Sequence, residues 1–265
     1  MRRFTPEYLE TTRDGMWDDS REALADLGLA TRERVLDAGA GSGELTRVLR
    51  EQSAGTVVAL DADPALLAHA PAPRVAGDAT RLPFVADAFD LVVCQALLIN
   101  LPDPLAALGE FARVSTDRVA AIEPDNSAVS IESTVDAEPA LARRARELYL
   151  RGVETDPTLG PARDLFERTG LVDITVARYD HVRTVAPPYT ETDIESARRK
   201  ASGAGLADDR ATVLAGGTTP EAFDTLREEW RAMGREVVEQ MQRDAYRHRE
   251  TIPFYVTVGR VSADS

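Results

Sequence analysis

Three glycines alternate with small residues directly after a short hydrophobic segment, in the stretch Val35-Leu36-Asp37-Ala38-Gly39-Ala40-Gly41-Ser42-Gly43. Glycine adopts positive φ without strain, and it lets a ligand approach the backbone closely. The helical pattern that follows begins with unpaired N–H groups, which can hold a carboxylate or another anionic group. The pattern predicts a ligand-binding turn between a strand and a helix, although a tight structural turn would look the same.

Two acidic residues each follow a further hydrophobic segment. Asp61 lies about 20 residues beyond the turn, where a carboxylate accepts both hydroxyls of a ribose in nucleotide-binding units. Asp78 follows the next segment, and Leu82-Pro83-Phe84 comes shortly after it. A carboxylate there can accept a hydrogen bond from an adenine amino group, while the apolar residues cover the ring. The alternative for both acids is an exposed position in a loop.

The elements that must position these residues alternate between strand-like and helix-like segments. Helical segments such as 43–51 and 104–114 separate the strand-like ones, which lie at 34–37, 56–60, 74–76, 89–94 and 119–122. This alternation is typical of a parallel, doubly wound α/β sheet. Before it, Thr5-Pro6-Glu7 predicts the start of an N-terminal helix that continues towards Leu24 and Leu27.

The pattern changes after Pro124. Helices are predicted at about 138–151 and 162–169, followed by a strand at 173–185 and a closing strand at 252–261. Between those strands the clearest helix begins at Thr219-Pro220. We therefore expect one domain, with an N-terminal helical cap, a cofactor-binding core, a helical insertion or lid, and a closing strand with its tail, at 1–30, 31–188, 189–250 and 251–265.

Taken together, the glycine turn, Asp61, Gly77-Asp78-Ala79 and the segment Phe89-Asp90-Leu91-Val92-Val93 resemble the class I S-adenosylmethionine-dependent methyltransferases of the UbiE and "methyltransferase domain 11" type. The resemblance covers residues 34 to about 125. It implies a Rossmann-like, mostly parallel sheet of seven strands, with an antiparallel last strand and the helical insertion before it. Members often carry His before Leu101-Pro102-Asp103, where this chain has Asn100, so a role for that His does not transfer.

The resemblance also implies a cofactor site for S-adenosylmethionine, with S-adenosylhomocysteine as the product. The glycines at 39, 41 and 43 would surround the methionine part, Asp61 would hold the ribose, and Asp78 with Ala79 would meet the adenine. Arg13, on the N-terminal helix with Tyr8 and Trp17, is a candidate partner for the cofactor carboxylate. The full set of expected cofactor residues is Arg13, Asp37, Gly39, Ala40, Gly41, Gly43, Asp61, Ala62, Asp78, Ala79 and Gln95.

Methyl transfer from a sulfonium is an in-line displacement, so positioning of the acceptor supplies most of the catalysis. A general base is optional. Three polar residues follow strands four and five, at the edge where ligands of such sheets bind: Gln95, Asn100 and Glu123. Each is a candidate to touch the substrate, and the alternative for each is capping or loop hydrogen bonding.

Other patterns carry less information. Phe223, Trp230, Met233 and Met241 form an apolar stripe that could line a substrate pocket, but ordinary core packing explains it better. The three histidines show no metal-binding spacing, so no metal site is predicted. The single cysteine, Cys94, lies in a strand that looks buried and is expected to be inert.

The net charge of −14 disfavours nucleic acid as a partner, because phosphate binding depends on basic residues. All but one of the 31 Lys and Arg residues are arginine. Salt adaptation or GC-rich codon usage would each give this bias. A single cysteine and the lack of a long apolar run favour a cytoplasmic protein without membrane insertion.

Two other functions remain open. A nicotinamide-dependent oxidoreductase also uses a glycine turn and a later acid, but Glu44 stands where its third glycine belongs. A non-catalytic cofactor-binding or regulatory protein could share the fold. A P-loop is excluded because no G-K-[ST] follows the glycines. The acceptor, the methylated atom and the oligomeric state do not follow from the sequence.

Overall fold

The computed structural model describes residues 16–17 and 20–262, which divide into two compact units. The core unit contains the described residues up to Asp125, Leu159–Tyr179, and those from Phe254 onward. The helical unit contains Asn126–Thr158 and Asp180–Pro253.

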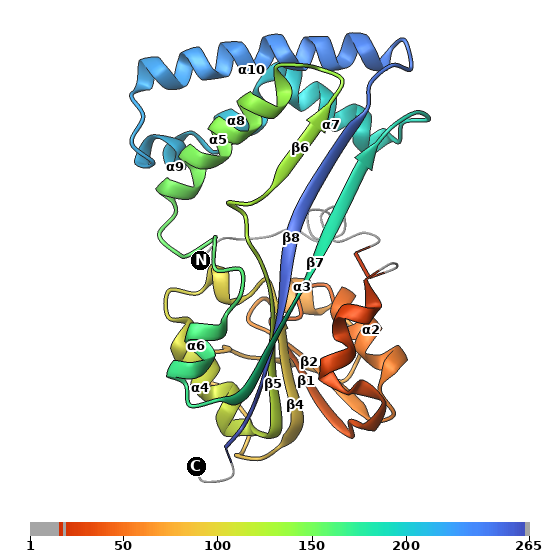
Figure 1. The fold of residues 1–265 in the computed structure, drawn as a ribbon, viewed down its shortest axis with the longest axis vertical. Helices are drawn as coiled ribbons and strands as arrows, with labels where there is room; N and C mark the ends of the chain where they lie inside the picture. Colours follow the sequence, from red (N-terminus) through yellow and green to blue (C-terminus); the bar gives the residue numbers. More distant parts are fainter. Residues whose placement is uncertain (1–15, 18–19, 263–265) are drawn as a thin grey trace. The chain divides into compact units, whose positions relative to one another are not determined.

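The core unit is built on a sheet in the order β3-β2-β1-β4-β5-β8 (Figure 1). Its strands are β1 (Arg34–Ala38), β2 (Thr56–Asp61), β3 (Arg74–Ala76), β4 (Phe89–Gln95), β5 (Ser115–Pro124) and the end of β8 (His248–Arg260). The first five are parallel, and β8 runs antiparallel to β5, with Val119 opposite Gly259. β7 (Val172–Val185) pairs with β8. The predicted α/β fold with an antiparallel last strand is confirmed.

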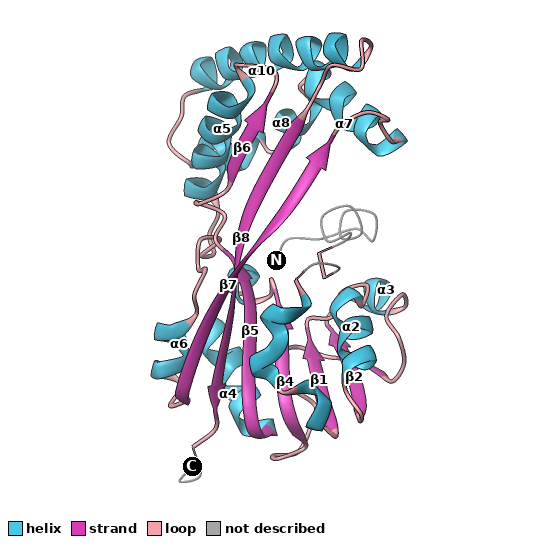
Figure 2. Ribbon diagram, turned by 45° about the vertical axis from the view of Figure 1, so that its right-hand side comes forward, coloured by secondary structure: helices cyan, strands magenta, loops and turns pink. Residues whose placement is uncertain are grey.

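Helices cover both faces of this sheet. Figures 1 and 2 show α4 (Pro104–Val114) and α6 (Arg163–Arg168) on one face, and α2 (Glu44–Gln52) and α3 (Pro64–Leu67) on the other. Because both faces are covered, the central strands contain continuous buried apolar runs, as in β4, where residues 91–94 are all apolar and buried. The short 3₁₀ helices of this unit are η1 (Arg21–Leu27), η2 (Leu29–Thr31) and η3 (Leu98–Asn100).

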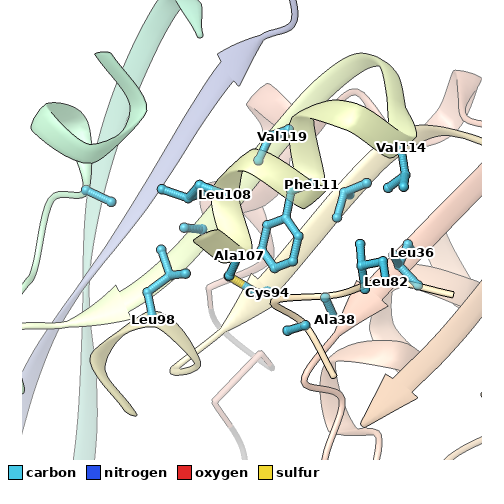
Figure 3. Packing of buried hydrophobic residues seen from close by; sticks show 14 of the residues in the cluster. Leu36, Ala38, Leu82, Cys94, Leu98, Ala107, Leu108, Phe111, Val114 and Val119 are labelled. Atoms are coloured by element: carbon cyan, nitrogen blue, oxygen red, sulfur yellow. The ribbon is translucent and has the colours of Figure 1, made fainter. Parts of the chain in front are cut away.

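The main apolar core lies between α4 and the central strands. Phe111 and Leu108 of α4 are fully buried with Cys94 of β4 and Val119 of β5 (Figure 3). Full burial of a side chain of the size of Leu or Phe contributes about 1.5–3 kcal/mol. The carboxyl ends of β1, β2 and β4 are therefore held on a rigid frame, and the functional candidates follow directly from those ends.

The helical unit contains α5 (Glu138–Gly152), α7 (Glu191–Ser202), α8 (Ala204–Asp208), α9 (Arg210–Ala215) and α10 (Pro220–Met241). It also has a strand that the sequence analysis did not predict, β6 (Ser130–Ser133), which pairs antiparallel with the start of β8. This strand comes in addition to the seven that were expected. Only one of its four residues, Ile131, is apolar, so the sequence shows no alternation of apolar and polar residues there. The unit thus takes in 126–158 as well as the segment 189–250 that was expected as an insertion.

The helix α10 starts as predicted, with the Thr219 side chain accepting the Ala222 N–H at 3.2 Å. Its apolar stripe is core: Phe223 packs in a cluster with residues of α5 and α9, and Met233 and Met241 pack in another. Trp230 is partly buried against both clusters. The stripe therefore holds the helical unit together.

The predicted N-terminal helix falls mostly outside the described residues, and so do Tyr8 and Arg13. Within the described part, Arg21–Leu27 forms a 3₁₀ helix that ends at Gly28, where φ is 65°. Among the described residues, no helix combines the length and the apolar character that crossing a membrane requires.

Candidate functional site

The glycine turn follows β1 and has the left-handed backbone that the sequence predicts. The φ angles of Gly39, Gly41 and Gly43 are 75°, 55° and 88°. A Cβ on Gly39 would lie 2.8 Å from Leu97 Cδ1, and one on Gly43 would lie 2.7 Å from Ala70 Cα. At Gly43 a side chain is excluded by space as well as by conformation, because the close atom belongs to the backbone, whereas at Gly39 the end of the Leu97 side chain can move aside.

Backbone hydrogen bonds fasten the turn to the neighbouring strand. The N–H groups of Gly39 and Ala40 both donate to the Leu60 carbonyl, at 2.7 and 2.9 Å, and the Gly43 N–H donates to the Ala40 carbonyl at 2.9 Å. These amides are used within the protein. These three N–H groups are therefore not available as donors to a ligand.

Asp61 is the last residue of β2, and its carboxylate is fixed in orientation. Oδ2 accepts the Gly41 N–H at 2.8 Å, and Oδ1 accepts the Asp63 N–H at 2.8 Å. Each carboxylate oxygen can accept more than one hydrogen bond, so the half-buried side chain can still accept from two hydroxyls. Ala62 beside it is exposed. This geometry suits the predicted contact with a ribose.

Asp78 lies two residues beyond β3 and is exposed. Its Oδ1 accepts hydrogen bonds from the Thr80 N–H and the Thr80 hydroxyl, both at 2.8 Å. Ala79 is buried and belongs to the same apolar cluster as Leu82. The arrangement combines an oriented carboxylate with an apolar floor, as expected for a site that meets an adenine ring.

Two more carboxylates flank the turn. Asp37 is fully buried and accepts the Thr46 hydroxyl at 2.5 Å through Oδ2. Glu44 is the first residue of α2, and the Ser42 hydroxyl lies 3.0 and 3.1 Å from its two oxygens. The positive end of α2, which was expected to hold a ligand carboxylate, thus already has a resident one. The sequence analysis noted Glu44 only because it stands where a dinucleotide-binding turn has its third glycine. An acid in the first turn of a helix is, however, favoured by the helix dipole.

Strand register brings these acids to one edge of the sheet. Ala38 pairs with Leu60, and Asp61 pairs with Ala76, so the residues after β1, β2 and β3 all lie at the carboxyl end. Among the described residues, that edge carries the carboxylates of Asp37, Glu44, Asp61 and Asp78, with Asp63 following Asp61. Such a field favours a ligand with cationic groups and hydroxyls, and it disfavours a polyphosphate.

The three candidate catalytic residues have different surroundings. Gln95 ends β4 and is 2% exposed, and its Nε2 donates to Met16 Sδ at 2.9 Å. Asn100 donates from Nδ2 to the Ala96 carbonyl at 2.8 Å, which is a local backbone contact. Residue 96 has a φ of 47°, an uncommon conformation for alanine, directly after Gln95.

Glu123 is fully buried at the end of β5 and holds η3 in place. It accepts the backbone N–H groups of Leu97 at 3.1 Å, Leu98 at 2.9 Å and Ile99 at 3.4 Å. A carboxylate with this many backbone donors is committed to orienting the loop after β4. These contacts support loop hydrogen bonding, the role that the sequence analysis gave as the alternative to contact with the substrate.

Cys94, the single cysteine, is buried in β4. Burial, with the nearby charges of Glu123 and Asp37, raises the pKa of the Cys94 thiol well above its usual value, so the thiol stays neutral. Among the described residues, no three His, Cys, Asp or Glu side chains are grouped as a metal site would require. Arg13 lies outside the described residues.

The part of the chain that carries this edge of the sheet is similar to known methyltransferases. Residues 36–119 match the family model described as "Methyltransferase domain". The chain is 34% identical over 152 residues to the demethylmenaquinone methyltransferase of Mycobacterium sp. strain KMS, covering 56% of this chain and 62% of that protein. It is 35% identical over 158 residues to the one of Mycolicibacterium paratuberculosis, covering 58% and 66%. The chain thus spans slightly less than two thirds of these two relatives and about half of others that it matches.

Solved structures show the same fold. A putative methyltransferase from Bacillus halodurans has a TM-score of 0.54 at 15% identity, covering 93% of this chain and all of that one. A putative methyltransferase from Haloferax volcanii, solved in complex with the Trm112 activator, has a TM-score of 0.51 at 20% identity, covering 95% and 92%. The predicted resemblance to methyltransferases of this type is confirmed over the glycine turn, Asp61, Asp78 and the strands that carry them.

Proposed function

The chain carries a methyltransferase domain at residues 36–119, and we propose that it transfers a methyl group from S-adenosylmethionine to a small molecule. The observation that carries this proposal is the set of carboxylates around the glycine turn. S-adenosylmethionine is a net cation with a sulfonium and an ammonium group, and its ribose has two free hydroxyls. The edge formed by Asp37, Glu44, Asp61 and Asp78 complements those groups.

Each part of the cofactor has residues that fit it. The turn at Gly39, Gly41 and Gly43, with Asp37 and Ala40 adjacent, suits the methionine part. Asp61, fixed by two backbone N–H groups, suits the ribose hydroxyls, with Ala62 beside it. Asp78 and Ala79 suit the adenine. Gln95 and Arg13 complete the proposed set.

When bound, S-adenosylmethionine supplies an activated methyl group. The acceptor atom bonds to the methyl carbon as the carbon–sulfur bond breaks, and the electron pair stays on sulfur, which leaves S-adenosylhomocysteine. The protein contributes mainly by holding the acceptor in line with that bond. Because Glu123 is committed to the backbone of η3, we assign it no role as a base.

An oxidoreductase that uses NAD fits the same edge less well. A pyrophosphate would approach several carboxylates, and Glu44 occupies the α2 terminus where the pyrophosphate of a dinucleotide belongs. A non-catalytic regulatory protein would bind S-adenosylmethionine without turnover, so a turnover assay separates that function from the proposed one.

The curated relatives are named for demethylmenaquinone, which makes a reduced quinone precursor the first acceptor to test. We further propose that the protein works in the cytoplasm and without a nucleic-acid partner. Its net charge of −14 and single cysteine support both statements. Salt adaptation is proposed on the same composition, and raised activity in molar salt would support it.

The test is calorimetry with S-adenosylmethionine, S-adenosylhomocysteine and NAD as separate titrants, in low and in molar salt. We expect saturable binding of the first two and none of NAD. A turnover assay with labelled methyl donor and reduced acceptor follows. Binding of NAD alone would contradict the proposal, and tight binding without turnover of any acceptor would favour the regulatory alternative.

A further inference from the structure

Glu110 and Arg113, both on α4, form an ion pair with two parallel hydrogen bonds. Arg113 donates from Nε to one Glu110 oxygen at 2.7 Å and from Nη2 to the other at 2.6 Å. In this bidentate arrangement the planar guanidinium and the carboxylate fix each other's orientation. The hydrogen bond from Arg113 also holds the pKa of the Glu110 carboxyl below its ordinary value, so the pair stays charged at neutral pH.

The same two side chains bind the backbone of the loop at residues 82–84. Glu110 accepts the Leu82 N–H at 2.8 Å through Oε2. Arg113 donates from Nη1 to the Phe84 carbonyl at 2.9 Å and from Nη2 to the Leu82 carbonyl at 3.3 Å. One ion pair thus satisfies three backbone groups of this short loop, and it fixes both ends of the loop against α4.

The side chains of this loop belong to the apolar core. Leu82 is 5% exposed and lies in the cluster with Leu36 of β1 and Phe111 of α4 (Figure 3). The Phe84 ring meets the Phe89 ring edge to face, with the ring centres 4.9 Å apart. Apolar packing holds these side chains, whereas the ion pair sets the direction of the backbone between them.

The loop is also coupled to the turn that carries Asp78. A Cβ built on Gly77, the residue before Asp78, would lie 3.2 Å from Pro83 Cδ, so the Pro83 ring packs against the backbone there. The Arg81 N–H donates to the Asp78 carbonyl at 3.0 Å, which closes the turn that leads directly into Leu82. A shift of the loop would therefore shift Asp78 as well.

We propose that Glu110 and Arg113 are positioning residues for the adenine of S-adenosylmethionine. They fix the loop 82–84, and the loop holds the Asp78 carboxylate in the direction from which it accepts the adenine amino group. The ion pair acts only through the loop and does not contact the cofactor. This inference rests on the proposed function, because that proposal places the adenine at Asp78 and Ala79.

The test is calorimetry on the full chain with two ligands: S-adenosylhomocysteine, and S-inosylhomocysteine, which has a carbonyl oxygen in place of the adenine amino group. We expect wild-type protein to bind the adenine compound about tenfold more tightly, because only its amino group can donate to Asp78. Arg113→Met removes the guanidinium donors and keeps an apolar stem. It should weaken binding of S-adenosylhomocysteine about tenfold and binding of S-inosylhomocysteine less than about threefold, since only the adenine compound loses a hydrogen bond.

A second variant keeps the test decisive if Arg113→Met does not fold. Glu110→Gln retains one oxygen that can accept the Leu82 N–H, but it cannot form the bidentate pair with Arg113. It should lower the preference for S-adenosylhomocysteine about threefold, because part of the loop anchor remains.

The matched control is Arg163→Met on α6. Arg163 also donates to a backbone carbonyl outside its helix, that of Ile174 at 2.9 Å, and it lies 3.8 Å from Glu167. This variant should change both affinities less than about twofold, as expected for a screened ion pair away from the adenine.

An ion pair that only stabilised the fold would give a different result. Arg113→Met and Glu110→Gln would then unfold at a lower temperature, but their folded forms would keep the wild-type preference between the two ligands. That outcome would overturn the inference and leave the cofactor proposal intact. Equal binding of the two ligands by wild-type protein would also overturn it, because the adenine amino group would then not meet Asp78. Failure of wild-type protein to bind S-adenosylhomocysteine would overturn the proposed function itself.

Discussion

The Asp61 carboxylate accepts the backbone N–H of Gly41 at 2.8 Å, so one side chain joins the end of β2 to the turn after β1. We expect Asp61→Asn to weaken binding of S-adenosylhomocysteine about 10- to 100-fold, because hydrogen bonds to a charged acceptor contribute about 1.5–3 kcal/mol. Calorimetry at constant salt measures the effect. Asp103→Asn is the control, since that acid caps α4 by accepting the Ala106 N–H at 3.0 Å. An Asp61→Asn protein with wild-type affinity would remove Asp61 from the proposed ribose contact.

The glycine turn allows a second matched comparison. Gly43 has a φ of 88°, and a Cβ there would meet the Ala70 backbone at 2.7 Å. We expect Gly43→Ala to lower the free energy of unfolding by at least about 1–3 kcal/mol, from backbone strain alone, and to abolish cofactor binding. Gly109 lies inside α4, and a Cβ added to it would meet nothing within 4 Å. Gly109→Ala should instead stabilise the protein by about 0.5–1 kcal/mol. Denaturant unfolding of both variants checks the pair, and a stable Gly43→Ala protein would contradict the geometry.

Substitution of Glu123 tests whether this acid has a structural or a catalytic role. Its oxygens accept N–H groups from Leu97, Leu98 and Ile99, and Gln at this position supplies only one carbonyl oxygen. We expect Glu123→Gln to lower the free energy of unfolding by about 1–3 kcal/mol. The pH profile of methyl transfer should keep its shape, because no proton passes through this group. Loss of one limb of that profile, without loss of stability, would show instead that Glu123 acts as a base.

The sequence predicts those features of the fold and the site that depend on residues close together in the chain. The strand–turn–helix at residues 35–51 and the helix from Pro220 follow from local patterns, and both occur where they are expected. The carboxylates at 61 and 78 follow from strand ends, which are also local. By contrast, the contact between Gln95 and Met16 joins positions far apart in the chain, and periodicity carries no information about it. The strand β6 is set by its partner β8 and not by its own four residues.

The helical unit contains a buried polar cluster whose members are also far apart in the sequence, so no local motif predicts it. Glu138 at the start of α5 is 1% exposed. It accepts hydrogen bonds from the Ser133 hydroxyl at 2.6 Å, the Tyr246 hydroxyl at 2.9 Å and Lys200 Nζ, and His248 Nδ1 lies 3.4 Å away. Burial alone would raise the pKa of this carboxyl, but the nearby His248 imidazole and the charge of Lys200 outweigh it and hold the pKa well below its ordinary value. Burial and the Glu138 charge raise the pKa of Tyr246, so its hydroxyl remains a donor.

A depressed carboxyl pKa in the folded state fixes the sign of the pH dependence. The stabilisation is fully present above the pKa of an unfolded Glu, at about pH 5 and higher, and is lost as the pH falls towards the folded-state value. We expect Lys200→Met to lower the free energy of unfolding at pH 7 by about 3 kcal/mol, because it leaves a buried charge without its main counter-charge. The variant should also lose stability less steeply between pH 5 and pH 3, since part of the Glu138 shift disappears with Lys200.

The control is the exposed ion pair of Arg198 and Glu195, which lies on α7 together with Lys200 and has its charged atoms 3.9 Å apart. Arg198→Met should change the free energy of unfolding by less than about 1 kcal/mol, because solvent screens the pair and its side chains remain free to move. Denaturant unfolding of both variants at pH 7, 5 and 3 measures the difference. Equal stability losses in the two variants at pH 7, or an unchanged pH dependence in Lys200→Met, would mean that Ser133, Tyr246 and His248 hold the Glu138 charge without the lysine. Hydrogen bonds would then outweigh the ion pair in organising the helical unit.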